Sequence, residues 1–172
     1  MLPRKWSELS AMKKKPAHPE GTCFVLPLRD GDYARGVVAR TNGKGAMFGY
    51  FFGPRLKNPA LAVVDHTLHP RNAVLVGKFG DLGLLEEKWQ AIGKITPWSR
   101  TDWPMPPLYR VDKVAGVAFI SHYDEDSFRC VKEVRMKLDE INPHSFPQDG
   151  LLGYVAAEIV VTKALANERK QK

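Results

Sequence analysis

The chain has 172 residues, of which 44% are apolar and 26% are charged, a composition typical of one globular domain with its own core. This balance excludes disorder as the default state, and no run approaches the roughly 18 apolar residues of a membrane-spanning helix. The formal net charge of +7 comes from the ends, because residues 1–19 contribute +4 and residues 161–172 contribute +3. The neutral body between them argues against a nucleic-acid groove.

Charge and apolar pattern divide the chain into three regions. Residues 1–19 are predicted to form a basic extension in which Trp6, Leu9 and Met12, spaced by three, indicate a short amphipathic helix. Residues 20–168 are predicted to form a single domain, and residues 169–172 a basic tail. Because no secretion signal is recognisable, we expect a cytoplasmic protein that does not bind a membrane.

The first part of the domain has the pattern of an antiparallel meander. Residues 22–28 form an apolar run, residues 29–32 a turn, and residues 33–40 a second run, which predicts a β-hairpin. A further turn at residues 41–45 precedes a strand rich in phenylalanine and tyrosine at residues 46–53. Three consecutive antiparallel strands are therefore expected.

The middle of the chain combines irregular segments with further strands. Residues 54–70 carry three prolines and are predicted to be irregular around a short strand at residues 60–64. A buried strand is predicted for residues 73–79 and an apolar turn for residues 82–85, after which Trp89 opens a second strand. These two strands are expected to form the central hairpin, with Trp89 as a core anchor.

The last part of the domain changes character. A proline-rich loop at residues 97–107 precedes strands predicted at residues 108–111 and 114–120. Residues 126–141 fit both helical and alternating periods, which leaves helix and strand open, whereas residues 151–166 predict a helix. The fold class expected is α+β, with a mostly antiparallel β sheet or partly closed barrel from residue 22 to residue 120 and a C-terminal helix.

No residue pattern indicates catalysis. Asp65, His66 and His69 form the one cluster with metal-ligand character, but structural zinc normally has four protein ligands, so we expect no metal. Cys23 and Cys130 lie in separate apolar segments without metal-ligand spacing, which predicts two buried free thiols. Because no nucleophile elbow or phosphate-binding loop occurs, we expect neither an enzyme nor a cofactor.

Two groups of residues are candidates for a protein-binding surface. Aromatic residues and arginine are enriched at the centres of interfaces, and the densest acidic run suits an electropositive partner. Packing within the domain is the alternative for the aromatic residues, and a solvated turn is the alternative for the acidic run. The candidates are Trp98, Arg100, Asp102, Trp103 and Tyr109 in or beside the proline-rich loop, and Asp124, Glu125 and Asp126 in the acidic run.

Three segments together resemble a known family. They are the first strand and turn at residues 21–28 and 30–36, then residues 79–85 followed by Trp89, Ile92 and Gly93, and finally Gly150, Gly153, Tyr154 and Glu158. Their order is similar to that of the immunity protein 26 family of bacterial polymorphic toxin systems. Glu87 stands where the family pattern has a small residue, often glycine.

The resemblance implies a mostly β, non-catalytic immunity domain. Such a protein binds the C-terminal domain of a cognate toxin and neutralises it by stoichiometric occlusion in the cytosol of the producing cell. A nucleic-acid-binding β-barrel with basic tails is the alternative, and it would use Tyr50, Phe51 and Phe52 or Trp98 to stack on bases. A hydrolase that uses a histidine ranks last.

Overall fold

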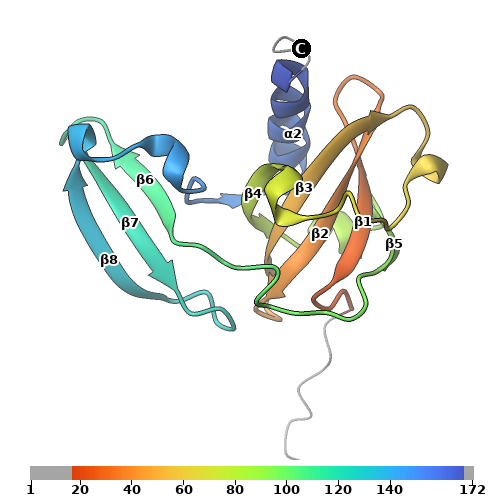
Figure 1. Ribbon diagram of the computed structural model, residues 1–172, viewed down its shortest axis with the longest axis horizontal. Coiled ribbons are helices and arrows are strands. Elements are labelled where there is room, and N and C mark those ends of the chain that lie inside the picture. The colour runs from red at the N-terminus through yellow and green to blue at the C-terminus, as the bar shows by residue number, and fades with distance from the viewer. Residues whose placement is uncertain (1–16, 169–172) are drawn as a thin grey trace, which may run out of the picture.

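In the computed structural model, which describes residues 17–168, a curved six-stranded sheet lies beside a separate three-stranded sheet, and one long helix packs on the larger sheet (Figure 1). The predicted α+β fold class is confirmed, and within the described residues the larger sheet does not close into a barrel. The predicted amphipathic helix falls within residues 1–16, and the basic tail is residues 169–172, so both lie outside the described residues.

The larger sheet has the strand order β5-β1-β2-β3-β4-β9 and contains the predicted meander. β1 and β2 pair antiparallel with Val25 opposite Arg35. The turn between them places Gly31 at a φ of 92°, a left-handed conformation that glycine adopts without steric cost. The strands are β1 (Thr22–Pro27), β2 (Tyr33–Thr41), β3 (Ala46–Leu56), β4 (Ala73–Gly80), β5 (Gln90–Lys94) and β9 (Leu151–Leu152).

β4 and β5 do not form a hairpin, so that prediction is wrong. β4 pairs with β3, whereas β5 pairs with β1 at the opposite side of the sheet, with Ala91 opposite Phe24. The predicted turn between them is a single helical turn, α1 (Leu82–Leu85), after which the chain crosses to the far edge. Both strands were correctly located, but a connection of nine residues is long enough to reach another partner.

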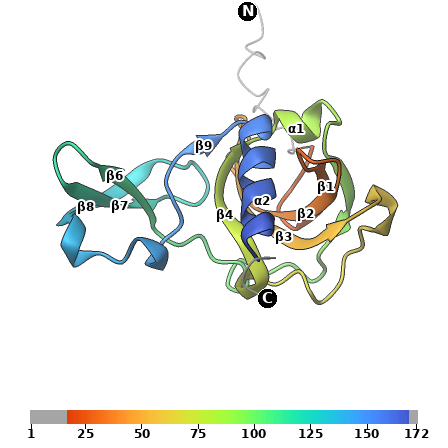
Figure 2. The ribbon, with the colours of Figure 1, turned by 90° about the horizontal axis from the view of Figure 1, so that it is seen from above.

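Trp89 is fully buried, which confirms its predicted role as a core anchor. Its indole ring stacks on Phe24 with centroids 5.2 Å apart and packs against Phe79 at 5.7 Å. The indole Nε1 donates to Glu158 Oε1 at 3.0 Å, so the polar edge of the ring is satisfied. Glu158 belongs to α2 (Tyr154–Glu168), the predicted C-terminal helix, which packs on β4 and β3 (Figure 2).

The smaller sheet has the order β6-β7-β8, and the expectation of one continuous sheet from residue 22 to residue 120 is wrong. Residues 126–141 contain a strand rather than a helix. Their sequence fits both periods, and the antiparallel pairing with β7 stabilises the strand. Two short 3-10 turns lead from this sheet to β9. The elements are β6 (Leu108–Asp112), β7 (Val117–Tyr123), β8 (Cys130–Lys137), η3 (Leu138–Glu140) and η4 (Pro143–Ser145).

Charge-assisted contacts attach the smaller sheet to the larger one. Asp149 lies between Lys78 on β4, whose Nζ is 2.8 Å from its Oδ1, and Tyr123 on β7, whose hydroxyl donates to its Oδ2 at 2.5 Å. Burial alone would raise the pKa of Asp149, but the hydrogen bonds from Lys78 and Tyr123 outweigh it and hold that pKa below its usual value. The ionised carboxylate therefore bridges the two sheets.

The segment between β3 and β4 is held by a side chain rather than by sheet pairing. The predicted strand at residues 60–64 is wrong, because this part of the chain forms the 3-10 turns η1 (Pro59–Leu61) and η2 (Pro70–Asn72). The buried Arg35 reaches it from β2 and donates to Val63 O at 2.9 Å. The guanidinium also donates to Asp65 Oδ1 and Thr67 Oγ1, so one arginine fixes an irregular segment on the sheet.

The two thiols differ in environment. Cys23 is buried as predicted, and that burial raises its pKa to about 11. Cys130 is exposed at the start of β8, so the prediction of a second buried thiol is wrong. Within residues 17–168, no helix has the length and apolar character needed to cross a membrane.

Candidate functional site

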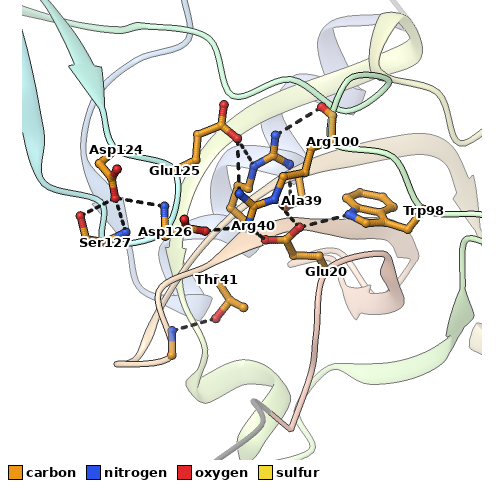
Figure 3. Close-up of polar contacts among 11 residues, drawn as sticks. Glu20, Ala39, Arg40, Thr41, Trp98, Arg100, Asp124, Glu125, Asp126 and Ser127 are labelled. Carbon is orange, nitrogen blue, oxygen red and sulfur yellow. Dashed lines mark hydrogen bonds and ion pairs between the residues drawn. The ribbon is translucent and has the colours of Figure 1, made fainter. Parts of the chain in front are cut away.

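Four segments that are distant in sequence meet where the larger sheet faces the turn between β7 and β8 (Figure 3). They are the two residues that precede β1, the end of β2, the loop 95–107 that joins the two sheets, and the turn 124–129. Their side chains form one hydrogen-bonded and ionic group, which we call the junction cluster. Its members are Glu20, Arg40, Trp98, Arg100, Glu125 and Asp126.

Arg40 is the buried base of the junction cluster. Its side chain is 1% exposed, and its Nε donates to Glu125 Oε2 at 2.5 Å. Its two terminal nitrogens donate to Ala39 O at 2.7 Å and to Arg100 O at 3.3 Å. A guanidinium ion in a protein core is costly unless it is paired and hydrogen-bonded, and these contacts meet both conditions. Arg40 thereby ties the larger sheet to the turn of the smaller sheet.

Arg100 forms the solvent-facing part of the cluster, with 43% of its side chain exposed. Its Nε and Nη2 donate to the two oxygens of Glu20 at 2.9 Å and 2.6 Å, and Nη2 also lies 2.7 Å from Asp126 Oδ1. The hydrogen bonds with Glu20 and then Asp126 raise the pKa of Arg100, so it is a permanent cation. A bidentate contact of this kind fixes the orientation of the guanidinium plane.

The acidic run is partly used within the fold. Asp124 stabilises its own turn, because its Oδ1 accepts from the Ser127 backbone N–H at 2.8 Å and from the Ser127 hydroxyl at 2.7 Å. These hydrogen bonds hold the pKa of Asp124 below its usual value. Glu125 is engaged by Arg40 from beneath. Asp126 has 77% of its side chain exposed and presents most of its carboxylate to solvent.

The two tryptophans of loop 95–107 stack with ring centroids 5.6 Å apart but have different roles. Trp103 is buried and packs edge-on against Tyr50 at 5.3 Å, so it supports the surface from within the core. Trp98 is half-buried, and its Nε1 donates to Glu20 Oε2 at 3.1 Å. Of the pair, Trp98 is the ring that a partner protein can reach.

Asp102 and Tyr109 lie outside the junction cluster. Asp102 is exposed and lines an open hollow of about 540 Å³, together with residues 64–66 and 94–97. Tyr109 is half-buried in β6, where its N–H donates to Pro147 O at 2.9 Å. Four of the eight predicted binding residues therefore belong to the junction cluster, namely Trp98, Arg100, Glu125 and Asp126. Trp103 lies beneath them, and Asp102, Tyr109 and Asp124 lie outside the cluster.

Sequence reasoning missed Glu20 and Arg40, the two members that hold the cluster together. Glu20 bonds to Trp98 and Arg100, which are 78 and 80 residues away, so no local pattern connects them. Arg40 gave a weaker signal, since a charged residue within an apolar strand requires a partner of opposite charge. That partner, Glu125, lies 85 residues along the chain.

The arrangement suits binding by shape and charge. Its ionised groups are engaged in ion pairs, and among residues 17–168 no three histidine, cysteine, aspartate or glutamate side chains are placed to hold a metal ion. The predicted base-stacking residues Tyr50, Phe51 and Phe52 are all buried, so that part of the nucleic-acid alternative is wrong. Trp98 is the remaining aromatic candidate at this surface.

The fold and site are those of a small α+β domain that presents a charged, aromatic surface on a rigid sheet. A model of the family described as Immunity protein 26 matches residues 19–119, more than half of the chain. The chain belongs to the immunity protein 26 family, as the sequence resemblance indicated. The matched region contains Glu20, Arg40, Trp98 and Arg100, whereas the turn 124–129, β8 and α2 follow it.

No curated protein and no solved structure matches the chain. Membership of an immunity protein family points to a toxin-neutralising role and to a toxin protein as the partner. Immunity proteins are generally non-enzymatic.

Proposed function

We propose that this immunity protein binds the toxin domain encoded beside its own gene and occludes that domain's active site or substrate groove in a one-to-one complex in the cytosol. Family membership supports the toxin partner. The observation that carries the choice of surface is the junction cluster, whose exposed side chains are held by bonds within the fold. Its toxin-facing side chains are Trp98, Arg100, Glu125 and Asp126, with Asp102 and Asp124 nearby.

The charge of this surface favours an electropositive partner. Four carboxylates, those of Glu20, Asp124, Glu125 and Asp126, face three arginines, Arg40, Arg100 and Arg129 in the same turn, so the surface has a net charge of −1 (3 − 4). An acidic surface accelerates association with a basic one and disfavours acidic partners. A toxin groove lined by lysine and arginine is therefore the complementary target.

The cluster is also preorganised for binding. Glu20 accepts hydrogen bonds from both Trp98 and Arg100, and Asp126 is anchored to Arg100 at 2.7 Å. Side chains that are already fixed lose little conformational entropy when a partner docks. The half-buried Trp98 ring adds the aromatic contact area that the centres of interfaces favour.

The proposal is tested by co-purifying the chain with the toxin domain encoded by the adjacent gene and by titrating toxin activity with the chain. We expect a one-to-one complex and complete inhibition at one equivalent. Asp126→Lys and Trp98→Ala are each expected to weaken binding at least tenfold, because one reverses the exposed charge and the other removes the aromatic contact. The matched control is Asp139→Lys, the same charge reversal at an exposed position in η3, and it should bind normally.

Two results would contradict the proposal at different levels. If both variants bind the toxin domain as tightly as the unaltered chain and retain its circular dichroism spectrum, the interface lies elsewhere on the molecule. If the unaltered chain neither binds nor inhibits the adjacent toxin domain, the proposed function itself is wrong. Binding of single-stranded nucleic acid that falls steeply with salt would support the alternative function instead.

A further inference from the structure

β8 is an open edge strand of unusual exposure. Among the described strands it pairs only with β7, and it lies at the outer margin of the molecule, away from the larger sheet (Figure 1). Seven of its eight residues are exposed, including Val131 at 67%. An edge strand presents unpaired backbone N–H and C=O groups, which another extended chain is able to use.

The ladder with β7 shows which backbone groups of β8 face outward. Leu138 N–H donates to Gly116 O, and hydrogen-bonded and non-bonded positions alternate along an antiparallel pair. The residues at even positions, 132, 134 and 136, therefore bond to β7. Glu133 and Arg135 direct their amide and carbonyl groups to the open side, while the outward N–H of Lys137 is taken by Glu140 Oε2 at 3.3 Å.

The side chains along this edge are basic in balance. Glu133 is neutralised by Arg110, whose Nη2 lies 3.3 Å from its Oε1. Lys132, Arg135 and Lys137 form no ion pair within the part of the chain that the structure describes. Opposite charges on neighbouring strands stabilise a sheet and like charges destabilise it. An incoming strand with aspartate or glutamate side chains would supply the missing partners.

We propose that β8 binds an extended acidic segment of the toxin domain, which adds to the smaller sheet as a fourth strand. The proposal rests on the proposed function for the identity of the partner and gives the complex a second contact, distinct from the acidic junction cluster. A second copy of this chain is the poorer occupant, because it would bring the uncompensated cations of two β8 strands together. Backbone pairing supplies the affinity, and the exposed cations select the acidic chain.

The test uses proline to remove one outward hydrogen-bond donor. Arg135→Pro deletes an N–H that β7 does not use, and edge strands tolerate proline at such positions. The matched control is Arg135→Thr, which also removes the charge but keeps the donor. We expect Arg135→Pro to weaken binding of the adjacent toxin domain at least tenfold and Arg135→Thr to weaken it less than threefold. The double variant Lys132→Glu with Arg135→Glu keeps every N–H and should also lose at least tenfold.

A second measurement is independent of the toxin. Two eight-residue peptides, one alternating glutamate with valine and one alternating lysine with valine, are titrated into the full chain while its backbone amide resonances are recorded by NMR. We expect the acidic peptide to shift the amides of Glu133 and Arg135 and the basic peptide to leave them unmoved. The shifts should shrink as salt is added, because exposed charges are screened.

The outcomes separate the two proposals. Toxin binding that survives Arg135→Pro and the charge-reversed double variant, with no shift at β8, overturns the edge proposal and leaves the proposed function standing. Failure of the unaltered chain to bind the toxin domain overturns the proposed function, and acidic-peptide shifts at β8 would then establish the edge as a site for another acidic strand. A wild-type dimer that Arg135→Pro dissociates would identify a second copy as the occupant and overturn the acidic partner.

Discussion

Replacing Arg40 by methionine tests whether the junction cluster holds the two sheets together. Methionine is shorter than arginine but fills the space of its aliphatic stem, and it donates no hydrogen bonds. The change therefore leaves Glu125, Ala39 O and Arg100 O without the donors that reach them at 2.5 Å, 2.7 Å and 3.3 Å. Packing is conserved as far as possible, so the effect reports on the polar contacts.

The expected loss of unfolding free energy is about 2–3 kcal/mol. Each carbonyl oxygen that loses its donor costs about 1 kcal/mol. Breaking a fully buried ion pair costs about 3–5 kcal/mol, but Glu125 is 41% exposed and regains water, so only a fraction of that figure applies. Removing the guanidinium also relieves its own desolvation, which offsets part of the loss.

Urea unfolding followed by circular dichroism measures this free energy, and hydrogen exchange of residues 124–129 locates the change. Arg40→Lys is the matched control, because lysine keeps the charge but cannot reach three acceptors with one planar fork, and it should lose about 1–2 kcal/mol. A loss below about 0.5 kcal/mol for Arg40→Met, with unchanged exchange in the turn, would refute the anchoring role of Arg40.

Four further predictions concern backbone strain, packing, thiol reactivity and pH. Glu87→Gly should stabilise the fold by about 0.5–1 kcal/mol. Glu87 has a φ of 57°, a left-handed conformation that costs a residue with a side chain about 1–2 kcal/mol in steric strain, and the greater conformational entropy of glycine in the unfolded chain offsets part of the gain. Gly36→Ala should destabilise by about 1–3 kcal/mol, because the added carbon would lie 2.2 Å from a phenylalanine ring. In the native protein Cys130 should react with Ellman's reagent while Cys23, buried with a pKa raised to about 11, should not. Asp149→Asn should lower the unfolding free energy by about 1–2 kcal/mol at neutral pH and by progressively less below about pH 4. Folding lowers the pKa of Asp149, so its carboxylate stabilises the fold at a pH above its unfolded-state pKa, and this stability is lost as the pH falls through its folded-state pKa.

Each of these predictions has an outcome that would contradict it. Glu86→Gly, at a neighbouring exposed position with a φ of −88°, should destabilise, and an equal gain there would remove the strain argument. Gly77→Ala, whose added carbon would meet its nearest atom at 3.9 Å, should cost less than about 0.5 kcal/mol and is the packing control. Two rapidly reacting thiols in the native protein would contradict the burial of Cys23. A cost of Asp149→Asn that is constant from about pH 3 to pH 7 would show that its carboxylate charge contributes nothing.

Local patterns located β1 to β5 of the larger sheet but not all of their partners, and the assignment of residues 151–152 to the C-terminal helix is wrong, because they form β9 beside β4 and α2 begins at Tyr154. The residues of β1 to β3 follow apolar runs separated by turns, and the hairpins between them follow from short connections. The pairing of β5 with β1 places Phe24 opposite Ala91, 67 residues along the chain, and no local periodicity indicates it. For β8, strand and helix periods fitted equally, and the presence of β7 beside it settled the choice.

The same limit applies to the site. Trp98 and Arg100 were recognised by residue type, and a proline-rich loop brings them together. The sequence did not indicate that part of the acidic run forms an ion pair within the fold, because Glu125 pairs with Arg40, which lies in the other sheet. Residue type predicted that these side chains take part in polar recognition, but whether the recognition is internal or external is decided by tertiary contacts.

The two buried arginines of β2 have a consequence for how this scaffold can diverge. Arg35 donates to Val63 O and to the side chains of Asp65 and Thr67. Arg40 donates to Arg100 O and to the side chain of Glu125, so each arginine tethers non-sheet segments through both a main-chain oxygen and side chains. Every residue type supplies a carbonyl oxygen, so positions 63 and 100 can change their side chains and keep the main-chain contact, whereas Asp65, Thr67 and Glu125 contribute through their own side chains. Sequence drift in these loops should therefore leave their placement unchanged at positions held by a carbonyl oxygen, and should loosen it where Asp65, Thr67 or Glu125 is replaced.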